Sequence, residues 1–224
     1  MRQISITLMM ILTAGACVGV DEPATAEHES AISQLIGEKF DPLNVGNIDG
    51  QNGWVGNCTV TDRVTSDRNA SDKYMKCVGG NNATKNIGLH GAGSYTLLVD
   101  LGPNNNVVDA THGKFSLEGP QGRVFQIAVG CNNIRVAFQM NGPIATLASF
   151  PCGSLSGPPA YRVVCNWSTS GTVLSCGAAP KPLDPTSFVN LPLPSGLRPF
   201  DSVAASTFAL PGATVYDNIY VWQN

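Results

Sequence analysis

Two short runs decide the fold class: Val124-Phe125-Gln126-Ile127-Ala128-Val129 and Ile134-Arg135-Val136-Ala137-Phe138-Gln139-Met140. In each run one set of alternate positions is uniformly apolar, which is the period of a β-strand with one buried face. The turn sequence Cys131-Asn132-Asn133 lies between them, so the runs are predicted to be two strands in succession. The side chains predicted for the core are Phe125, Ile127, Val129, Ile134, Val136, Phe138 and Met140.

Segments of the same kind recur on both sides of this pair. They are rich in β-branched and aromatic residues, and turns containing Gly, Pro and Asn separate them. This pattern predicts an all-β protein, an antiparallel two-sheet β-sandwich. Residues 180–199 include six prolines and are predicted to form a surface loop, because proline donates no hydrogen bond to a sheet. The further strand segments are 95–99, 114–117, 161–164, 172–174 and 214–222.

The composition agrees with a β-protein. Of 224 residues, 24 are Gly and 15 are Pro, and only 13% are charged, which excludes coiled coils and helical repeats. The net charge of −3 without a basic cluster in the sequence argues against nucleic acid as a partner. Beyond the N-terminus no apolar run reaches the roughly 18 residues that a membrane span needs, so membrane contact is expected only through a lipid anchor.

Residues 1–26 are predicted to be a signal segment, because a positive start precedes an uncharged, mostly apolar run from Ile4 to Val20. Two processing sites compete. One is cleavage before Cys17, in the box Ala14-Gly15-Ala16-Cys17, which looks like that of a bacterial lipoprotein with an acylated cysteine; the other is cleavage after Ala26. Either route predicts an extracytoplasmic protein, secreted or lipid-anchored at the cell envelope.

The predicted domain boundaries follow from the charges. Residues 21–38 contain five acidic side chains and little apolar content, so residues 27–38 are predicted to be a solvated tether. Residues 39–224 are predicted to form the single sandwich domain.

Seven cysteines test the predicted export. Acylation or removal of Cys17 leaves six, an even number that suits an oxidising compartment. Six cysteines allow 15 pairings, and bonds between chain neighbours are the simplest choice. These predicted disulfides are Cys58 with Cys77, Cys131 with Cys152, and Cys165 with Cys176.

The best supported of these pairs is Cys165 with Cys176. A turn over Ser168 to Gly171 folds the segment so that the two cysteines stand opposite each other, within reach of a disulfide. Zinc binding is disfavoured, because there is no Cys-x-x-Cys and the three histidines are scattered.

Three segments look like parts of a known fold. One is Phe40 to Trp54, which ends in Gly50-Gln51-Asn52-Gly53-Trp54, and the others are Val163 to Leu174 and Val215 to Val221, with Asp217-Asn218-Ile219. In this order they resemble the entry strand, the central strand, turn and strand, and the last strand of concanavalin A-like jelly rolls of the laminin G-like type. The resemblance implies two antiparallel sheets and a hydrogen-bonding role for Asp217 and Asn218 in the framework. Family members bind glycans or proteins or cleave glycans, and fold alone does not choose between these activities.

Catalytic signatures are weak. Retaining glycosidases of this fold carry alternate carboxylates on one strand, whereas Glu118 is the only Glu after Glu38 and lies in a turn sequence. Tyr161 and Arg162 are adjacent and are expected to point to opposite faces, and His112 is a lone histidine. We therefore expect non-catalytic recognition of extracellular glycan or of a cell-surface partner. The alternatives are a glycan-active enzyme (lyase or hydrolase) of unrecognised type and a structural envelope protein.

The strand at 214–222 offers the best candidates for ligand contact. Strict alternation puts Val215, Asp217, Ile219 and Val221 on a core-facing side. The opposite side carries rings and an amide that suit sugar binding, although they would equally pack under the long loop. Trp167, near a hairpin tip, is expected to be exposed, and Trp54 to be buried. The candidate ligand-binding residues are Tyr216, Asn218, Tyr220, Trp222 and Trp167.

One stretch also allows a calcium site. It carries several of the oxygen ligands that calcium prefers, at a spacing that fits no strict template, so an ordinary Asn-rich turn is the alternative. No other cofactor is expected. The candidate ligands are Asp100, Asn104, Asn106 and Asp109.

Overall fold

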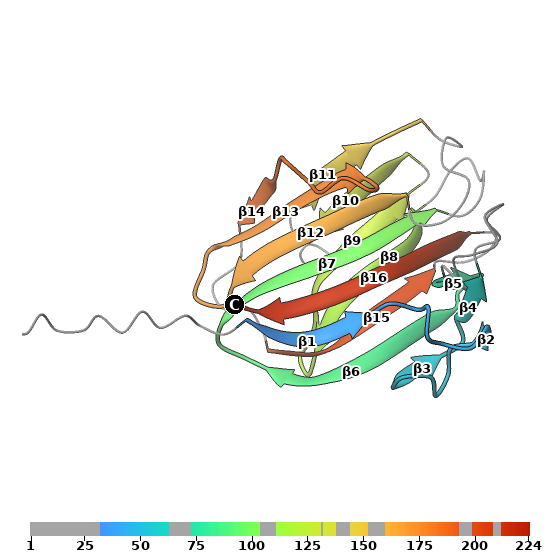
Figure 1. Cartoon of the computed structure of the whole chain (residues 1–224). Coiled ribbons are helices and arrows are strands. Elements are labelled where there is room, and N and C mark those ends of the chain that lie inside the picture. Colours follow the sequence, from blue (N-terminus) through green and yellow to red (C-terminus); the bar gives the residue numbers. More distant parts are fainter. Residues whose placement is uncertain are drawn as a thin grey trace, which may run out of the picture. The chain divides into compact units, whose positions relative to one another are not determined.

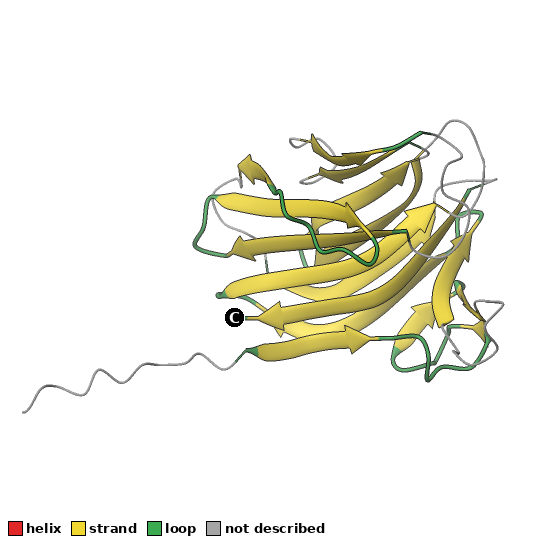
Figure 2. Ribbon diagram, turned by 45° about the horizontal axis from the view of Figure 1, so that its top comes forward, coloured by secondary structure: helices red, strands yellow, loops and turns green. Residues whose placement is uncertain are grey.

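The computed structural model describes residues 32–62, 73–103, 111–130, 132–137, 144–151, 160–192, 199–207 and 212–224. All regular elements in these ranges are strands, as Figure 2 shows. None of the described residues forms a helix with the length and apolar character of a membrane span. The strands are β1 (Ser33–Glu38), β2 (Gly46–Asn47), β3 (Trp54–Gly56), β4 (Thr59–Asp62), β5 (Lys73–Val78), β6 (Asn82–His90), β7 (Ser94–Pro103), β8 (Thr111–Gly119), β9 (Gly122–Gly130), β10 (Asn133–Ala137), β11 (Ile144–Ser149), β12 (Tyr161–Ser168), β13 (Val173–Pro180), β14 (Val189–Pro192), β15 (Phe200–Thr207) and β16 (Ala213–Gln223).

The strands form two antiparallel sheets that pack face to face (Figure 1). Sheet A has the order β14-β13-β12-β7-β16-β5-β4-β2, and β1 also pairs with β16. Sheet B has the order β11-β10-β9-β8-β15-β6-β3. The prediction of an all-β, antiparallel two-sheet sandwich is confirmed.

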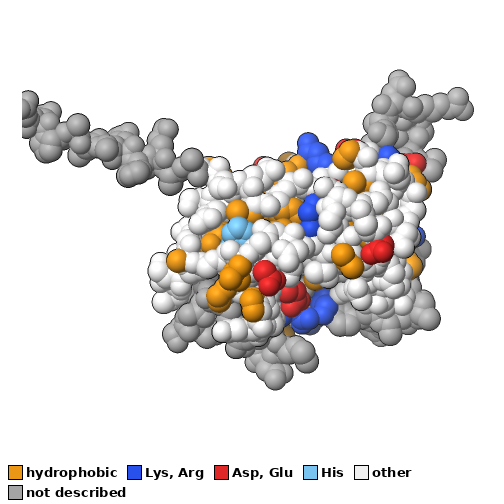
Figure 3. Space-filling view, turned by 90° about the horizontal axis from the view of Figure 1, so that it is seen from below, with side chains coloured by type: hydrophobic (Ala, Val, Ile, Leu, Met, Phe, Trp, Pro, Cys, Tyr) orange, Lys and Arg blue, Asp and Glu red, His pale blue; other side chains and the backbone are white. Residues whose placement is uncertain are grey.

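The core between the sheets follows the alternation in the sequence. The predicted core residues on β9 and β10 that the structure describes are all fully buried; Phe138 and Met140 lie outside the described residues. Full burial of each such side chain contributes roughly 1.5–3 kcal/mol. Outside the core, charged side chains are sparse on the face seen in Figure 3, so a group of charges on this protein is informative. The confirmed core residues are Phe125, Ile127, Val129, Ile134 and Val136.

The folded part begins earlier than predicted. Residues 33–38, assigned to the tether, form β1 and pair antiparallel with β16, from Ser33 opposite Gln223 to Glu38 opposite Ile219. Ile36 and Glu38 point into the molecule and are 4% and 1% exposed. The acidic content of the segment was misleading because Glu38 is buried rather than solvated.

Glu38 is stabilised by three donors from the segment that follows and from sheet B. Its Oε2 accepts from Lys85 Nζ at 2.8 Å, from Trp54 Nε1 at 3.1 Å and from Asn52 Nδ2 at 2.9 Å. Trp54 is fully buried, as predicted. A buried carboxylate needs such partners, and here they connect β1 to β3 and β6.

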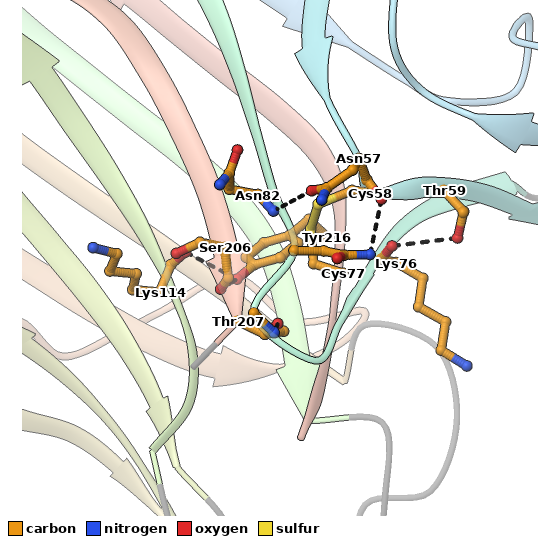
Figure 4. Close-up of a disulfide and its surroundings, with 12 residues drawn as sticks. Asn57, Cys58, Thr59, Lys76, Cys77, Asn82, Lys114, Ser206, Thr207 and Tyr216 are labelled. Atoms are coloured by element: carbon orange, nitrogen blue, oxygen red, sulfur yellow. Dashed lines mark hydrogen bonds between the residues drawn. A yellow bond between two sulfur atoms is a disulfide. The ribbon is translucent and has the colours of Figure 1, made fainter. Parts of the chain in front are cut away.

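Two of the three predicted disulfides are present in the described residues. Cys58–Cys77 joins β4's start to β5 (Figure 4). Cys165–Cys176 joins directly opposed positions of β12 and β13, with Cα atoms 4.1 Å apart. Cys131 and Cys152 lie outside the described residues, as do Cys17 and residues 1–26, so their predicted roles stay predictions.

The proline-rich segment is mostly loop where it is described, but it contains β14, which the sequence did not predict. This short strand pairs with β13 at the edge of sheet A, where a missing backbone donor is tolerated. The loop before it approaches β13 closely, because a Cβ at Gly177 would meet Pro185 and Phe188. It therefore covers one end of the outer face of sheet A.

Candidate functional site

A β-bulge divides the strand that carries most of the predicted ligand-binding residues. The register of β16 against β7 shifts between Asp217 and Tyr220, and Asn218 has the left-handed φ of 46°. One extra residue reverses which side chains face the core. The residues before the bulge therefore have the opposite orientation from the one that strict alternation predicts.

Tyr216, before the bulge, is a core residue, and its prediction as a ligand-binding residue is wrong. It is 0% exposed, and its hydroxyl donates to the backbone oxygens of Lys114 at 2.9 Å and Ser206 at 2.8 Å (Figure 4). Those partners lie on β8 and β15, so Tyr216 connects sheet A to sheet B. Burial raises its pKa above the ordinary value of a tyrosine.

Trp167 is also buried, contrary to the prediction. It is 4% exposed and packs against three rings: Tyr95 at 5.5 Å, Phe125 at 5.2 Å and Phe200 at 6.0 Å between centroids. On β12 it shares the inward face with Cys165. The alternation of inward and outward side chains along β12 therefore determines the burial of Trp167 more than its position near a turn does.

Tyr220 and Trp222 lie after the bulge and face outward, as predicted. Their rings are parallel, with 3° between the planes and 5.2 Å between the centroids, which is an offset stack. Both are half-buried. Leu98 lies beside Tyr220 on β7, and Val164 lies beside Leu98 on β12. We call these four residues the aromatic patch.

A row of amides and hydroxyls borders the aromatic patch. The row contains Gln34, Thr96 and Asn166. Trp222 of the patch stands between Gln34 and Thr96, so the four residues lie side by side on four neighbouring strands. Thr96 Oγ1 donates to Asn166 Oδ1 at 2.8 Å and accepts from Asn224 Nδ2 at 3.0 Å. The patch therefore combines apolar rings with donors and acceptors on one outer face.

Gly37 explains how Gln34 reaches the aromatic patch. Gly37 stands opposite Tyr220, and a Cβ there would collide with the side-chain amide of Gln34. The missing side chain lets that amide lie against the backbone beside Tyr220. The predicted tether placed both residues outside the domain, so the sequence analysis missed Gln34.

Next to the aromatic patch, the outer face of sheet A carries a group of paired charges around Asp100. Asp100 is 0% exposed. Its Oδ1 accepts from Arg162 Nε at 2.9 Å, and its Oδ2 accepts from Lys181 Nζ and Asn218 Nδ2, both at 2.8 Å. Arg162 also bonds to Asp184 at 2.9 Å. These hydrogen bonds, chiefly that to Asp100, raise the pKa of Arg162 above its ordinary value.

This arrangement decides the role of two predicted residues. Asn218 donates to both Asp100 and Asp217, which agrees with the framework role that the resemblance implies rather than with ligand contact. Asp100 does not fit a calcium ligand, because both its oxygens already accept from cations. Asn104, Asn106 and Asp109 lie outside the described residues, so calcium in that stretch stays a prediction. No three acidic, Cys or His side chains that the structure describes come together as metal ligands.

The outer face of sheet B carries a second polar network that the sequence analysis did not identify. Glu118 accepts from Ser116 Oγ at 2.5 Å and from Arg123 Nε at 3.0 Å. Arg123 also donates to Gln126 at 2.8 Å. The residues of this network come from β8 and β9, which form a hairpin whose turn closes with Gly119 opposite Gly122.

Comparison with known proteins supports the fold. No family model matches the chain, and no curated protein matches it. The structure resembles the CBM2 module of the evolved Dit of Lactobacillus casei BL23 phage J-1, with 11% identity, a TM-score of 0.53, and coverage of 86% of this chain and 96% of that one. It also resembles lectin II from Ulex europaeus, with 9% identity, a TM-score of 0.51, and coverage of 86% and 100%.

A third similar structure is the binding domain of botulinum neurotoxin serotype D, with 10% identity, a TM-score of 0.52, and coverage of 86% of this chain and 48% of that one. At such identities the likeness concerns the fold. The fold is therefore a jelly-roll sandwich of two antiparallel sheets, as the resemblance predicted.

Proposed function

We propose that this chain is an exported, non-catalytic recognition module that binds extracellular glycan through the aromatic patch on sheet A. The observation that carries the proposal is the parallel, half-buried pair of Tyr220 and Trp222 beside a row of amides and hydroxyls. Aromatic faces suit the apolar faces of sugar rings, and a few placed polar groups give specificity. Both kinds of group come from strands, which hold them rigidly.

The fold and the disulfides support the same proposal. The lectin from Ulex europaeus has also been solved in complex with galactose, at a TM-score of 0.51 to this chain, so this fold accommodates a sugar ligand in that protein. Disulfides persist in oxidising compartments, and Cys58–Cys77 and Cys165–Cys176 are both formed. The carboxylates described on the outer face of sheet A are paired with cations, which favours binding over acid–base catalysis there.

A polysaccharide panel tests the proposal. The full chain is passed over immobilised neutral and anionic glycans, and the eluted glycans are examined for new reducing or unsaturated ends. Retention on at least one glycan without new ends is expected, whereas new ends would support the enzyme alternative. No retention on any glycan would overturn the proposal in favour of a surface protein partner or a structural role.

Two substitutions locate the binding surface. Tyr220→Ala and Trp222→Ala are each expected to lower affinity about tenfold, equivalent to about 1.4 kcal/mol. Leu89→Ala is the matched control, because Leu89 lies on sheet B and is 67% exposed. Unchanged affinity in both aromatic variants would show that the aromatic patch is not the binding surface.

A further inference from the structure

The aromatic patch continues toward the edge of sheet A. From β16, the strands β7, β12, β13 and β14 follow one another to that edge (Figure 1). Tyr220, Leu98 and Val164 stand opposite one another on the first three of these strands. The next position in this apolar line is Gly177 on β13, opposite Val164. Because Gly177 has no side chain, the line would end there unless another segment supplied one.

The loop between β13 and β14 supplies an aromatic ring at this point. A Cβ added to Gly177 would lie 3.3 Å from Cδ1 of Phe188 and 2.8 Å from Cβ of Pro185. That Cβ would point to the outer face, because the preceding residue, Cys176, is buried in the core. Both loop residues therefore lie over the outer face, in line with the aromatic patch. Phe188 is 42% exposed, so part of its ring is open to a ligand.

A polar line runs beside the apolar one. The row of amides and hydroxyls that contains Thr96 and Asn166 continues with Ser175 on β13 and Asn190 on β14. Oδ1 of Asn166 accepts from Thr96, so the amide nitrogen of Asn166 is the end that can donate to a ligand. Ser175 is half-buried and Asn190 is exposed. Donors and acceptors therefore accompany the apolar line as far as the edge of the sheet.

Both lines are long compared with one sugar ring. Three strand spacings, about 14 Å in all, separate Tyr220 from Gly177. Four spacings, about 19 Å, separate Trp222 from Asn190. Over this length an apolar line lies beside a polar one. An extended sugar chain has the same arrangement, since its ring faces are apolar and its ring edges carry hydroxyls.

The charges on this face do not favour an anionic chain. In the group around Asp100, the cations Arg162 and Lys181 pair with three carboxylates, those of Asp100, Asp184 and Asp217. The group has no surplus positive charge, so an anionic sugar beside it would lose water without gaining a counter-charge. The side chains of both lines are themselves uncharged. The surface therefore matches a neutral chain.

We propose that the ligand of the aromatic patch is a neutral, unbranched glycan bound along its length, across the strands from β16 to β14. One end of the bound segment stacks on Tyr220 and Trp222, and the other end contacts Phe188. Asn166 and Ser175 hydrogen-bond to hydroxyls between these ends. The inference rests on the proposed function, because it takes the aromatic patch as the binding surface, and it adds the class of glycan and a second aromatic contact.

A length series tests the inference. The full chain is titrated with neutral hexasaccharides from cellulose, mannan, xylan and chitin, and then with the two-unit and four-unit forms of the one that binds best. Affinity is expected to rise about tenfold from two units to six, because only the longer chain also reaches the aromatic contact on the loop. Equal affinity for all lengths would overturn the inference and leave the proposed function in place.

The same titrations distinguish failure of the inference from failure of the proposed function. If none of the neutral hexasaccharides binds but polygalacturonate or a single sugar does, the inference is wrong and glycan recognition stands. If no glycan binds, both are wrong. Binding of the neutral chain is expected to be equal at low and at high NaCl, since it involves no ion pair that salt could screen.

Phe188→Ala tests the second aromatic contact. This variant is expected to weaken binding of six units about tenfold and to leave binding of two units unchanged, because the aromatic patch alone holds the shorter chain. Leu183→Ala is the matched control, since Leu183 is an apolar residue of the same loop and is 64% exposed; no change is expected. Tyr220→Ala is expected to weaken binding of both lengths.

The length dependence of these variants decides the binding mode. If Phe188→Ala lowers the affinity for two units as much as for six, or changes neither, the bound chain does not extend from the aromatic patch to the loop. Far-UV circular dichroism checks that each variant folds.

Discussion

The two outer faces of the sandwich bury their ion pairs to different degrees. On sheet A, Asp100 is buried and accepts from Arg162 and Lys181, so the charges there are matched within the protein. On sheet B, Arg123 Nε lies 3.0 Å from Glu118 Oε1, and these two side chains are 21% and 26% exposed. A buried carboxylate that loses its partners is costly, whereas an ion pair near the solvent contributes little to stability. The comparison therefore assigns the charges around Asp100 to structure and leaves the rings of sheet A for the proposed binding.

The largest effect that would test this comparison is expected at Asp100. Asp100→Asn leaves two cations beside a neutral amide and is expected to lower the free energy of unfolding by about 3 kcal/mol. Denaturant unfolding measures this loss. Asp184→Asn is the matched control, because Asp184 also pairs with Arg162 but its side chain is 76% exposed, and a loss below about 1 kcal/mol is expected. Equal losses in the two variants would contradict a structural role specific to Asp100.

A smaller effect is expected at Tyr216, where a substitution tells a core residue from a ligand-binding residue. Tyr216→Phe removes one hydroxyl that donates to two backbone oxygens of sheet B. We expect a loss of about 1–2 kcal/mol in stability and unchanged affinity for any glycan that the aromatic patch binds. A loss of affinity in a variant that stays folded would return Tyr216 to the ligand-binding residues.

The alternation of side chains along the strands was sufficient to predict the core residues and one disulfide from the sequence. Phe125 and Ile127 are buried because every second residue of an unbroken strand faces inward, and Cys165 meets Cys176 because the hairpin between them is regular. The same rule failed at Tyr216, where a bulge inserts one residue into β16. Nothing in the local pattern marks that bulge, apart from the Asp217-Asn218 pair that adopts it.

Other predictions were wrong where they relied on the composition of a segment or on a position near a turn instead of on the alternation of side chains along a strand. Trp167 is buried because it shares a face with Cys165, a signal that was present in the sequence. The charge of Glu38 suggested a side chain exposed to solvent, but Lys85, 47 residues away in the sequence, neutralises it. The position of Lys114 and Arg135 on either side of Ala128 was not predictable, because it depends on the register of three strands.

The pairing of β1 with β16 has a consequence for when the aromatic patch comes into being. Gln34 and Trp222 stand side by side although they lie near opposite ends of the described chain. During synthesis the first of these strands waits for nearly the whole of the sandwich before its partner emerges. A nascent chain therefore lacks Tyr220 and Trp222 until β16 has emerged, and the row from Gln34 to Trp222 forms only once β1 and β16 have paired.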